Sequence, residues 1–162
     1  MREQTVCFTG HRIIPAERQP FLQTLLRKEL IRLIERGYRY FGAGGALGFD
    51  TLAAQEVLHL RKDYPRIRLI LVLPCKNQTR GWPTSDVLLY QKILQAADKV
   101  VFTSEEYYRG CMFKRNRHLV DNSSVCVCYL TADSGGTAYT VRYAQSKDLE
   151  IINLGEVAVS PQ

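Results

Sequence analysis

Two glycine-rich segments that each lead into an expected helix are the residues best suited to bind an anion. Glycine lets the backbone adopt positive φ and lets a ligand approach where a Cβ atom would collide. The first turn of a helix offers unpaired N–H groups and the positive end of its dipole, which favour a phosphate or a carboxylate. From sequence the alternative stays open that these segments are only tight turns and helix caps. The segments are Gly44-Gly45-Ala46 and Gly135-Gly136-Thr137.

A polar segment that follows the first expected strand, Thr9-Gly10-His11-Arg12, adds a cation. The guanidinium of Arg12 is suited to pair with a phosphate through two hydrogen bonds, although a plain surface arginine would look the same in sequence. His11 is placed to donate a hydrogen bond to a ligand. A single histidine without a partner gives little support for acid/base catalysis.

Two later groups of polar residues extend the candidate set. The loop after the third expected strand carries Gln78 and Trp82, and the indole would either stack on a base or pack on the next helix. Arg115 and Asn116 lie on an expected helix near the same edge of the sheet. Arg115 is either a second cation for the ligand or the ion-pair partner of Asp121.

Four acidic residues lie near these loops. Asp50 opens an expected helix, where its carboxylate would either hold a sugar hydroxyl or order the glycine loop. Glu105, Glu106 and Asp133 are the candidates for a catalytic acid if the protein is an enzyme.

Alternating strand and helix patterns position all these residues. The run 67–73 is almost continuously apolar, which is typical of a strand buried on both faces of a parallel sheet. The alternation predicts a three-layer α/β sandwich with helices on both faces of a mostly parallel sheet of about six strands. The expected strands are 4–8, 38–41, 67–73, 99–102, 124–130 and 150–154, and the expected helices are 21–37, 51–62, 86–97, 111–121 and 137–147.

The loops that follow parallel strands lie at one edge of the sheet, and ligands bind there near the point where the strand order reverses. The candidate residues named above follow the first five expected strands or open the helices after them. We therefore expect them to meet at this edge around a small phosphorylated ligand.

Composition limits the class of protein. The 162 residues, 46% of them apolar, suit a single domain over 1–162. The formal charge of +6 suits an anionic ligand, but the basic residues are scattered, which makes nucleic acid a less favoured partner. The five cysteines include no Cys-x-x-Cys pair, and no segment resembles a secretory leader or a membrane span. We expect a cytoplasmic protein with no metal, no cofactor and no membrane partner.

The segments Thr9 to Arg12, Gly44 to Asp50 and Gly135 to Thr137, in this order, resemble the YpsA-like branch of the SLOG superfamily. This Rossmann-like group also includes DNA-processing protein A and the Lonely Guy enzymes. The resemblance covers nearly the whole chain and extends to Gln78, Trp82, Arg115 and Asn116. It implies a Rossmann-like fold that binds a nucleotide or a nucleotide-derived ligand at the glycine loops, and by analogy a homo-oligomer.

One position departs from the related hydrolases. Lonely Guy enzymes are phosphoribohydrolases whose glycine motif ends in a working glutamate, and the matching position here is Thr140. A threonine cannot act as that carboxylate. We therefore expect a protein that binds a nucleotide, for example as a sensor. An N-glycosidic nucleotide hydrolase is the first alternative, and single-stranded nucleic-acid binding is the second.

Overall fold

Short apolar runs form the strands of this protein and alternate with amphipathic helices. The computed structural model describes residues 1–155, so residues 156–162 of the expected domain lie outside the described residues. The strands are β1 (Thr5–Gly10), β2 (Tyr40–Ala43), β3 (Arg68–Leu73), β4 (Lys99–Phe102), β5 (Val125–Tyr129) and β6 (Glu150–Asn153). The helices are α1 (Gln19–Glu35), α2 (Phe49–Arg61), α3 (Thr84–Ala96), α4 (Cys111–Asp121) and α5 (Gly136–Ser146), with 3-10 turns at Arg2–Gln4 and Ala16–Arg18.

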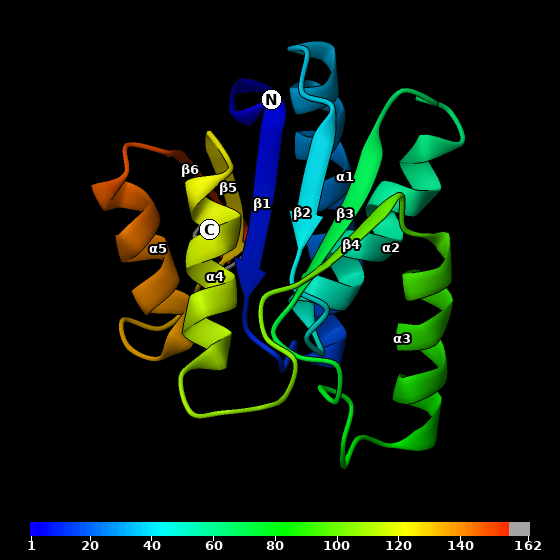
Figure 1. The fold of residues 1–162 in the computed structure, drawn as a ribbon. Coiled ribbons are helices and arrows are strands. Elements are labelled where there is room, and N and C mark those ends of the chain that lie inside the picture. The colour runs from blue at the N-terminus through cyan, green and yellow to red at the C-terminus, as the bar shows by residue number, and fades with distance from the viewer. Residues whose placement is uncertain (156–162) are drawn as a thin grey trace.

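The six strands described form one sheet in the order β4-β3-β2-β1-β5-β6. Every neighbouring pair runs parallel, which confirms the expected α/β fold and makes the sheet wholly rather than mostly parallel. The order reverses beside β1, because the chain moves outward from β1 through β4 and then returns to place β5 on the other side of β1 (Figure 1).

Helices cover both faces of the sheet and complete three layers. On one face α1 and α2 bury apolar stripes against side chains such as Phe8, Phe41 and Leu71. On the other face α4 and α5 pack on Cys7, Cys126 and their neighbours. The buried cysteines act as small apolar side chains there. None of the helices within residues 1–155 combines the length and the apolar composition needed to cross a bilayer.

Every strand end and helix end within residues 1–155 lies within two residues of its expected position, and the shifts of β1 and β2 bear on the site. β1 continues to Gly10 because Thr9 and Gly10 pair with the end of β5. β2 begins at Tyr40 and ends at Ala43, so Gly42 lies in the strand instead of the loop. A Cβ atom at Gly42 would lie 2.9 Å from a methyl group of Leu119, so glycine at this point lets α4 pack on the sheet.

Candidate functional site

A cavity of about 270 Å³ lies at the carboxyl edge of the sheet, where the strand order reverses. In Figure 1 the strand arrows point to this edge, and α4 and α5 begin there. The cavity brings together side chains and backbone from the ends of β1 and β2 and from the first turns of α2, α4 and α5. Its lining residues are Thr9, Gly10, Arg12, Ala46, Asp50, Met112, Phe113, Arg115, Asn116, Gly136 and Thr137.

The loop that carries Arg12 is docked on the turn before α2. The N–H of Phe49 donates to the His11 carbonyl at 3.1 Å, and the Phe49 side chain occupies the space that a Cβ atom at Gly10 would need. Gly48, at φ +79°, packs against the Arg12 backbone with no room for a side chain. These contacts hold Arg12 at the cavity, where its exposed guanidinium makes no hydrogen bond or ion pair with any described residue.

Arg115 is a buried cation at the base of the cavity. Its side chain is 4% exposed, and its Nη1 donates to the Gly44 carbonyl while its Nε donates to Asn116 Oδ1 at 2.6 Å. Burial lowers the pKa of Arg115, and the charge of Asp50 partly offsets that effect. The ion pair with Asp121 that the sequence allowed is not formed, since Asp121 instead accepts a hydrogen bond from Tyr143 at 2.7 Å.

Asp50 orders the glycine loop from inside. Its Oδ2 accepts a hydrogen bond of 3.2 Å from the Ala46 N–H, and the next residue, Thr51, donates to the Ala46 carbonyl at 2.9 Å. Burial raises the pKa of Asp50, while Arg115 and the Ala46 N–H oppose the rise. The other carboxylate oxygen, Oδ1, makes no hydrogen bond among residues 1–155, and Asp50 is one of the residues that line the cavity.

The α5 N-terminus opens onto the cavity. Gly135, at φ +98°, precedes the helix, and no side chain caps it, so neither Ser134 nor Thr137 takes the capping role that the sequence allowed. The N–H groups of Gly136 and Thr137 lie in the first turn, where α-helical N–H groups have no partner within the helix. A ligand anion at this end would meet free donors and the positive end of the dipole.

A hydrogen-bonded chain links the two cavity helices. Asn116 Nδ2 on α4 donates to Thr140 Oγ1 at 3.0 Å, and the Thr140 hydroxyl donates to the Gly136 carbonyl at 2.9 Å. Since Asn116 Oδ1 also accepts from Arg115, this chain fixes the Arg115 guanidinium relative to the first turn of α5. Thr140 is therefore a structural link at the position where the resemblance suggested a missing catalytic glutamate.

Gly44, Gly45, Gln78 and Trp82, which were expected to bind the ligand, are not among the residues that line the cavity. Gly44 and Gly45 pack under Arg115 and against Leu73. The buried Gln78 amide lies near the Gly44 carbonyl at 3.5 Å and accepts from Tyr90 at 3.4 Å, and Trp82 contacts Tyr90 edge to face at 5.5 Å. The loop of Gln78 and Trp82 therefore packs on α3.

His11 lies beside the cavity in a neighbouring hollow that also contains Arg12. Its Nε2 accepts a hydrogen bond of 2.9 Å from the Thr131 N–H, and its ring contacts Tyr129 edge to face. Partial burial lowers the pKa of His11. A neutral acceptor imidazole fits this arrangement, so the ring supports the loop after β5.

None of the three candidate catalytic acids lines the cavity. Glu105 pairs with Lys76 at 2.9 Å and shares a different surface hollow with Glu106. Asp133 is exposed, and its carbonyl accepts a hydrogen bond from Arg142 at 3.1 Å. Asp50 is the one carboxylate in the cavity lining among the described residues. No group of three or more potential metal ligands gathers anywhere within residues 1–155.

Sequence reasoning missed Met112 and Phe113, which also line the cavity. Both precede Arg115 on the first turn of α4, so their nearness to a candidate cation was the available signal. Helical spacing identifies only the buried face of α4, which carries Leu119 and Val120.

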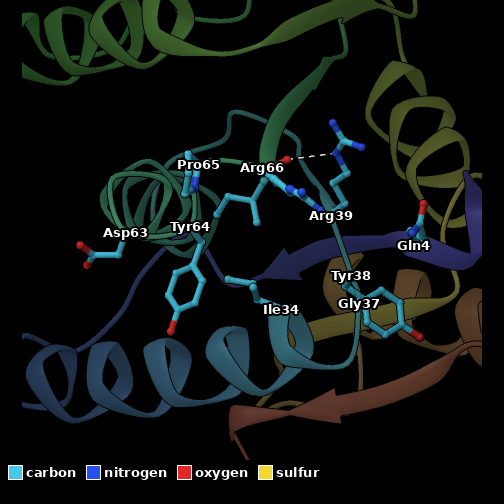
Figure 2. Close-up of a pocket in the computed structure, with 10 residues that line it drawn as sticks. Gln4, Ile34, Gly37, Tyr38, Arg39, Asp63, Tyr64, Pro65 and Arg66 are labelled. Atoms are coloured by element: carbon cyan, nitrogen blue, oxygen red, sulfur yellow. Dashed lines mark hydrogen bonds between the residues drawn. The ribbon is translucent and has the colours of Figure 1, made fainter.

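A second hollow, of about 500 Å³, lies at the opposite edge of the sheet. Figure 2 shows its arginine and tyrosine side chains, with Arg39 donating a hydrogen bond of 3.1 Å to the Arg66 carbonyl. The hollow includes Gly37 and Asp63, next to the ends of α1 and α2. Helix C-termini carry the negative end of the dipole, which disfavours a phosphate. The cavity at the carboxyl edge is therefore the stronger candidate.

Comparison with known proteins agrees with the sequence-based resemblance. A protein-family model described as the YspA SLOG family matches residues 15–153. The uncharacterised SPbeta prophage-derived protein YoqJ of Bacillus subtilis is 30% identical over 123 residues, which cover 68% of this chain and 71% of YoqJ. A UPF0398 protein of Brevibacillus brevis is 27% identical over 129 residues, covering 78% of this chain and 69% of that protein.

Two solved structures share the fold. DNA processing protein A from Helicobacter pylori, described with a single-stranded DNA binding mode, matches with a TM-score of 0.67 and 21% identity. The match covers 94% of this chain and 65% of that one. DNA processing protein A from Streptococcus pneumoniae matches with a TM-score of 0.70 and 15% identity over 93% of this chain and 50% of that one. This chain therefore spans between half and two thirds of these structures, and identities this low establish the fold alone.

Proposed function

This chain belongs to the YspA SLOG family, and from that premise we propose that it binds a nucleotide or nucleotide-derived ligand in the cavity at the carboxyl edge. A nucleoside mono- or diphosphate or ADP-ribose has the chemistry that the cavity suits. The observation that carries the proposal is the convergence of Arg12, Arg115 and the uncapped N-terminus of α5 on one cavity.

The electrostatics of the cavity favour an anion. Arg115 is buried and forms no ion pair with a carboxylate of residues 1–155, so its charge is desolvated and only partly compensated by Asp50. Arg12 lies at the same cavity, and its guanidinium donors have no partner among residues 1–155. A phosphate placed between these cations and the Gly136 and Thr137 N–H groups would offset the cost of burying Arg115.

The remaining lining residues suit the sugar of a nucleotide. Asp50 lines the cavity, and its Oδ1, which has no hydrogen-bond partner among residues 1–155, would accept from a ribose hydroxyl. Its Oδ2 is already engaged with the Ala46 N–H. The proposal therefore gives Asp50 both roles that the sequence left open, with Oδ2 ordering the loop and Oδ1 available to a sugar hydroxyl.

Isothermal titration calorimetry with AMP, ADP, ADP-ribose and ribose 5-phosphate tests the proposal. Arg12→Ala should weaken binding about tenfold or more, because a charge-assisted hydrogen bond contributes roughly 1.5–3 kcal/mol. Gly136→Val should also weaken binding. A Cβ atom at Gly136 meets no protein atom within 4 Å, and Gly136 lines the cavity, so the valine side chain would occupy space meant for the ligand. Arg39→Ala, an arginine at the opposite edge, is the matched control. Absence of binding by the wild type, or equal binding by Arg12→Ala, would refute the proposal.

Single-stranded nucleic acid is the second candidate ligand. The fold likeness to DNA processing protein A and the formal charge of +6 favour it. This candidate predicts that an oligonucleotide is retarded in a gel and that its affinity falls steeply as salt rises. If the oligonucleotide is not retarded, or if its retardation does not change with salt, this second candidate is refuted.

A further inference from the structure

We propose that Phe113 is the surface on which the planar base of the ligand stacks, with Tyr139 supporting it from behind. The cavity ligand then carries a nucleobase, and sugar phosphates without a base bind more weakly. This inference rests on the proposed function, because it assumes that the phosphate is held by Arg12 and the first turn of α5.

Phe113 is an exposed aromatic side chain on the wall of a polar cavity. It is 40% exposed, and it lines the cavity together with Arg115 and Asn116 from the same first turns of α4. Exposed large apolar side chains next to a cluster of polar groups are typical of ligand-binding surfaces. One end of α4 therefore offers both a cation for a phosphate and a flat apolar face.

Tyr139 fixes the orientation of the Phe113 ring. The two rings meet edge to face, with centroids 4.8 Å apart and planes at 73°. The Tyr139 hydroxyl accepts a hydrogen bond of 3.3 Å from Arg117, which holds the tyrosine from the α4 side. An edge-to-face contact covers at most one face of the Phe113 ring, so Tyr139 leaves another face for a planar group.

A purely structural explanation accounts for only part of this arrangement. The Phe113–Tyr139 contact helps α4 pack on α5, but packing alone would bury the rings, and both stay more than a third exposed. Trp82, the aromatic that the sequence suggested for base stacking, is engaged with Tyr90 outside the cavity. Phe113 is the aromatic side chain of the cavity lining among the described residues.

The test compares two probes that differ only in the base, AMP and ribose 5-phosphate, by calorimetry. The wild type should bind AMP about tenfold or more tightly than ribose 5-phosphate, the size expected for one base stacked on an aromatic ring. Phe113→Ala should remove most of this preference while its affinity for ribose 5-phosphate changes by less than about twofold. Phe113→Tyr should keep the preference, and the adenine protons of AMP should shift upfield in NMR spectra of the wild type but not of Phe113→Ala.

Phe21→Ala is the matched control, since Phe21 is 50% exposed on α1 at the other face of the sheet. Binding of ribose 5-phosphate by Phe113→Ala shows that the variant is folded. If Phe113→Ala keeps the wild-type preference, or the wild type binds both probes equally, the stacking role is refuted while phosphate binding stands. If the wild type binds neither probe, both the stacking role and the proposed function are refuted.

Discussion

Replacing Gly44 by alanine should destabilise the protein through a single contact, the one between the glycine loop and Arg115. A Cβ atom at Gly44 would lie 2.5 Å from Arg115 Nη1 and 2.7 Å from its Cζ. The guanidinium borders the cavity and can shift, but a shift has a cost because its Nη1 donates to the Gly44 carbonyl and its Nε donates to Asn116. Alanine therefore forces the buried cation away from its acceptor.

The size of the effect follows from two contributions. Overpacking in a buried site costs about 1–3 kcal/mol, and a hydrogen bond from a charged donor contributes about 1.5–3 kcal/mol. If the guanidinium moves, the clash is relieved but the hydrogen bond is lost, so the two costs do not add. We therefore expect the free energy of unfolding to fall by about 2 kcal/mol. For a domain of this size that corresponds to a decrease in Tm of about 4–8 °C.

Urea denaturation of a double-mutant cycle measures the effect. In an Arg115→Ala background the Gly44→Ala substitution should cost less than about 0.5 kcal/mol, because the clashing group has been removed. Gly136→Ala is the control, since a Cβ atom there meets nothing within 4 Å and alanine favours a helix over glycine. An equal cost of Gly44→Ala in both backgrounds would contradict the reasoning, because the clash would then lie with something other than Arg115.

Three further predictions concern buried or partly buried charges. Burial raises the pKa of Asp50 above its ordinary value of 3.8, so the native state binds a proton at Asp50 more readily than the unfolded state does. The stability of the wild type relative to Asp50→Asn should therefore fall as pH rises through the raised pKa. Urea denaturation at several pH values measures this difference. Burial lowers the pKa of His11, so its ring protons should titrate with a midpoint below 6.5 in NMR spectra, and the stability it contributes should be lost as pH falls from about 6.5 through that midpoint. Arg27→Ala should lower the free energy of unfolding by about 2 kcal/mol in thermal or urea denaturation, because the carboxylate of Glu56, which is 2% exposed, loses its ion-pair partner at 2.6 Å. Arg32→Ala is the control at an exposed ion pair and should lower it by less than about 0.5 kcal/mol.

Much of the fold was readable from local patterns. Apolar runs and helical spacing placed β4 at Lys99–Phe102 and α4 at Cys111–Asp121 with the bounds that the structure shows. The near-continuous apolar stretch that became β3 indicated a parallel sheet covered on both faces, as observed. These features depend on residues within about ten positions of one another, so a single sequence contains the information.

The candidate site was only partly readable. Arg12 and the first turn of α5 were expected at one edge of the sheet, because the loops after parallel strands gather there, and both line the cavity. The glycine loop was expected to hold a phosphate; Ala46 of this loop lines the cavity, while the Gly44 carbonyl accepts a hydrogen bond from Arg115. Trp82 looked suited to stack on a base, but Phe113 is the aromatic residue that lines the cavity.

The sequence by itself determined the kind and order of the elements, and with them the edge of the sheet at which the candidate cavity lies. Only the tertiary structure decided which side chains reach that cavity, because the deciding contacts join distant residues. Arg115 and Gly44 are 71 positions apart, and Asn116 and Thr140 are 24 apart. Periodicity records whether a residue faces the core, but the partner that it meets there depends on how the helices pack on the sheet.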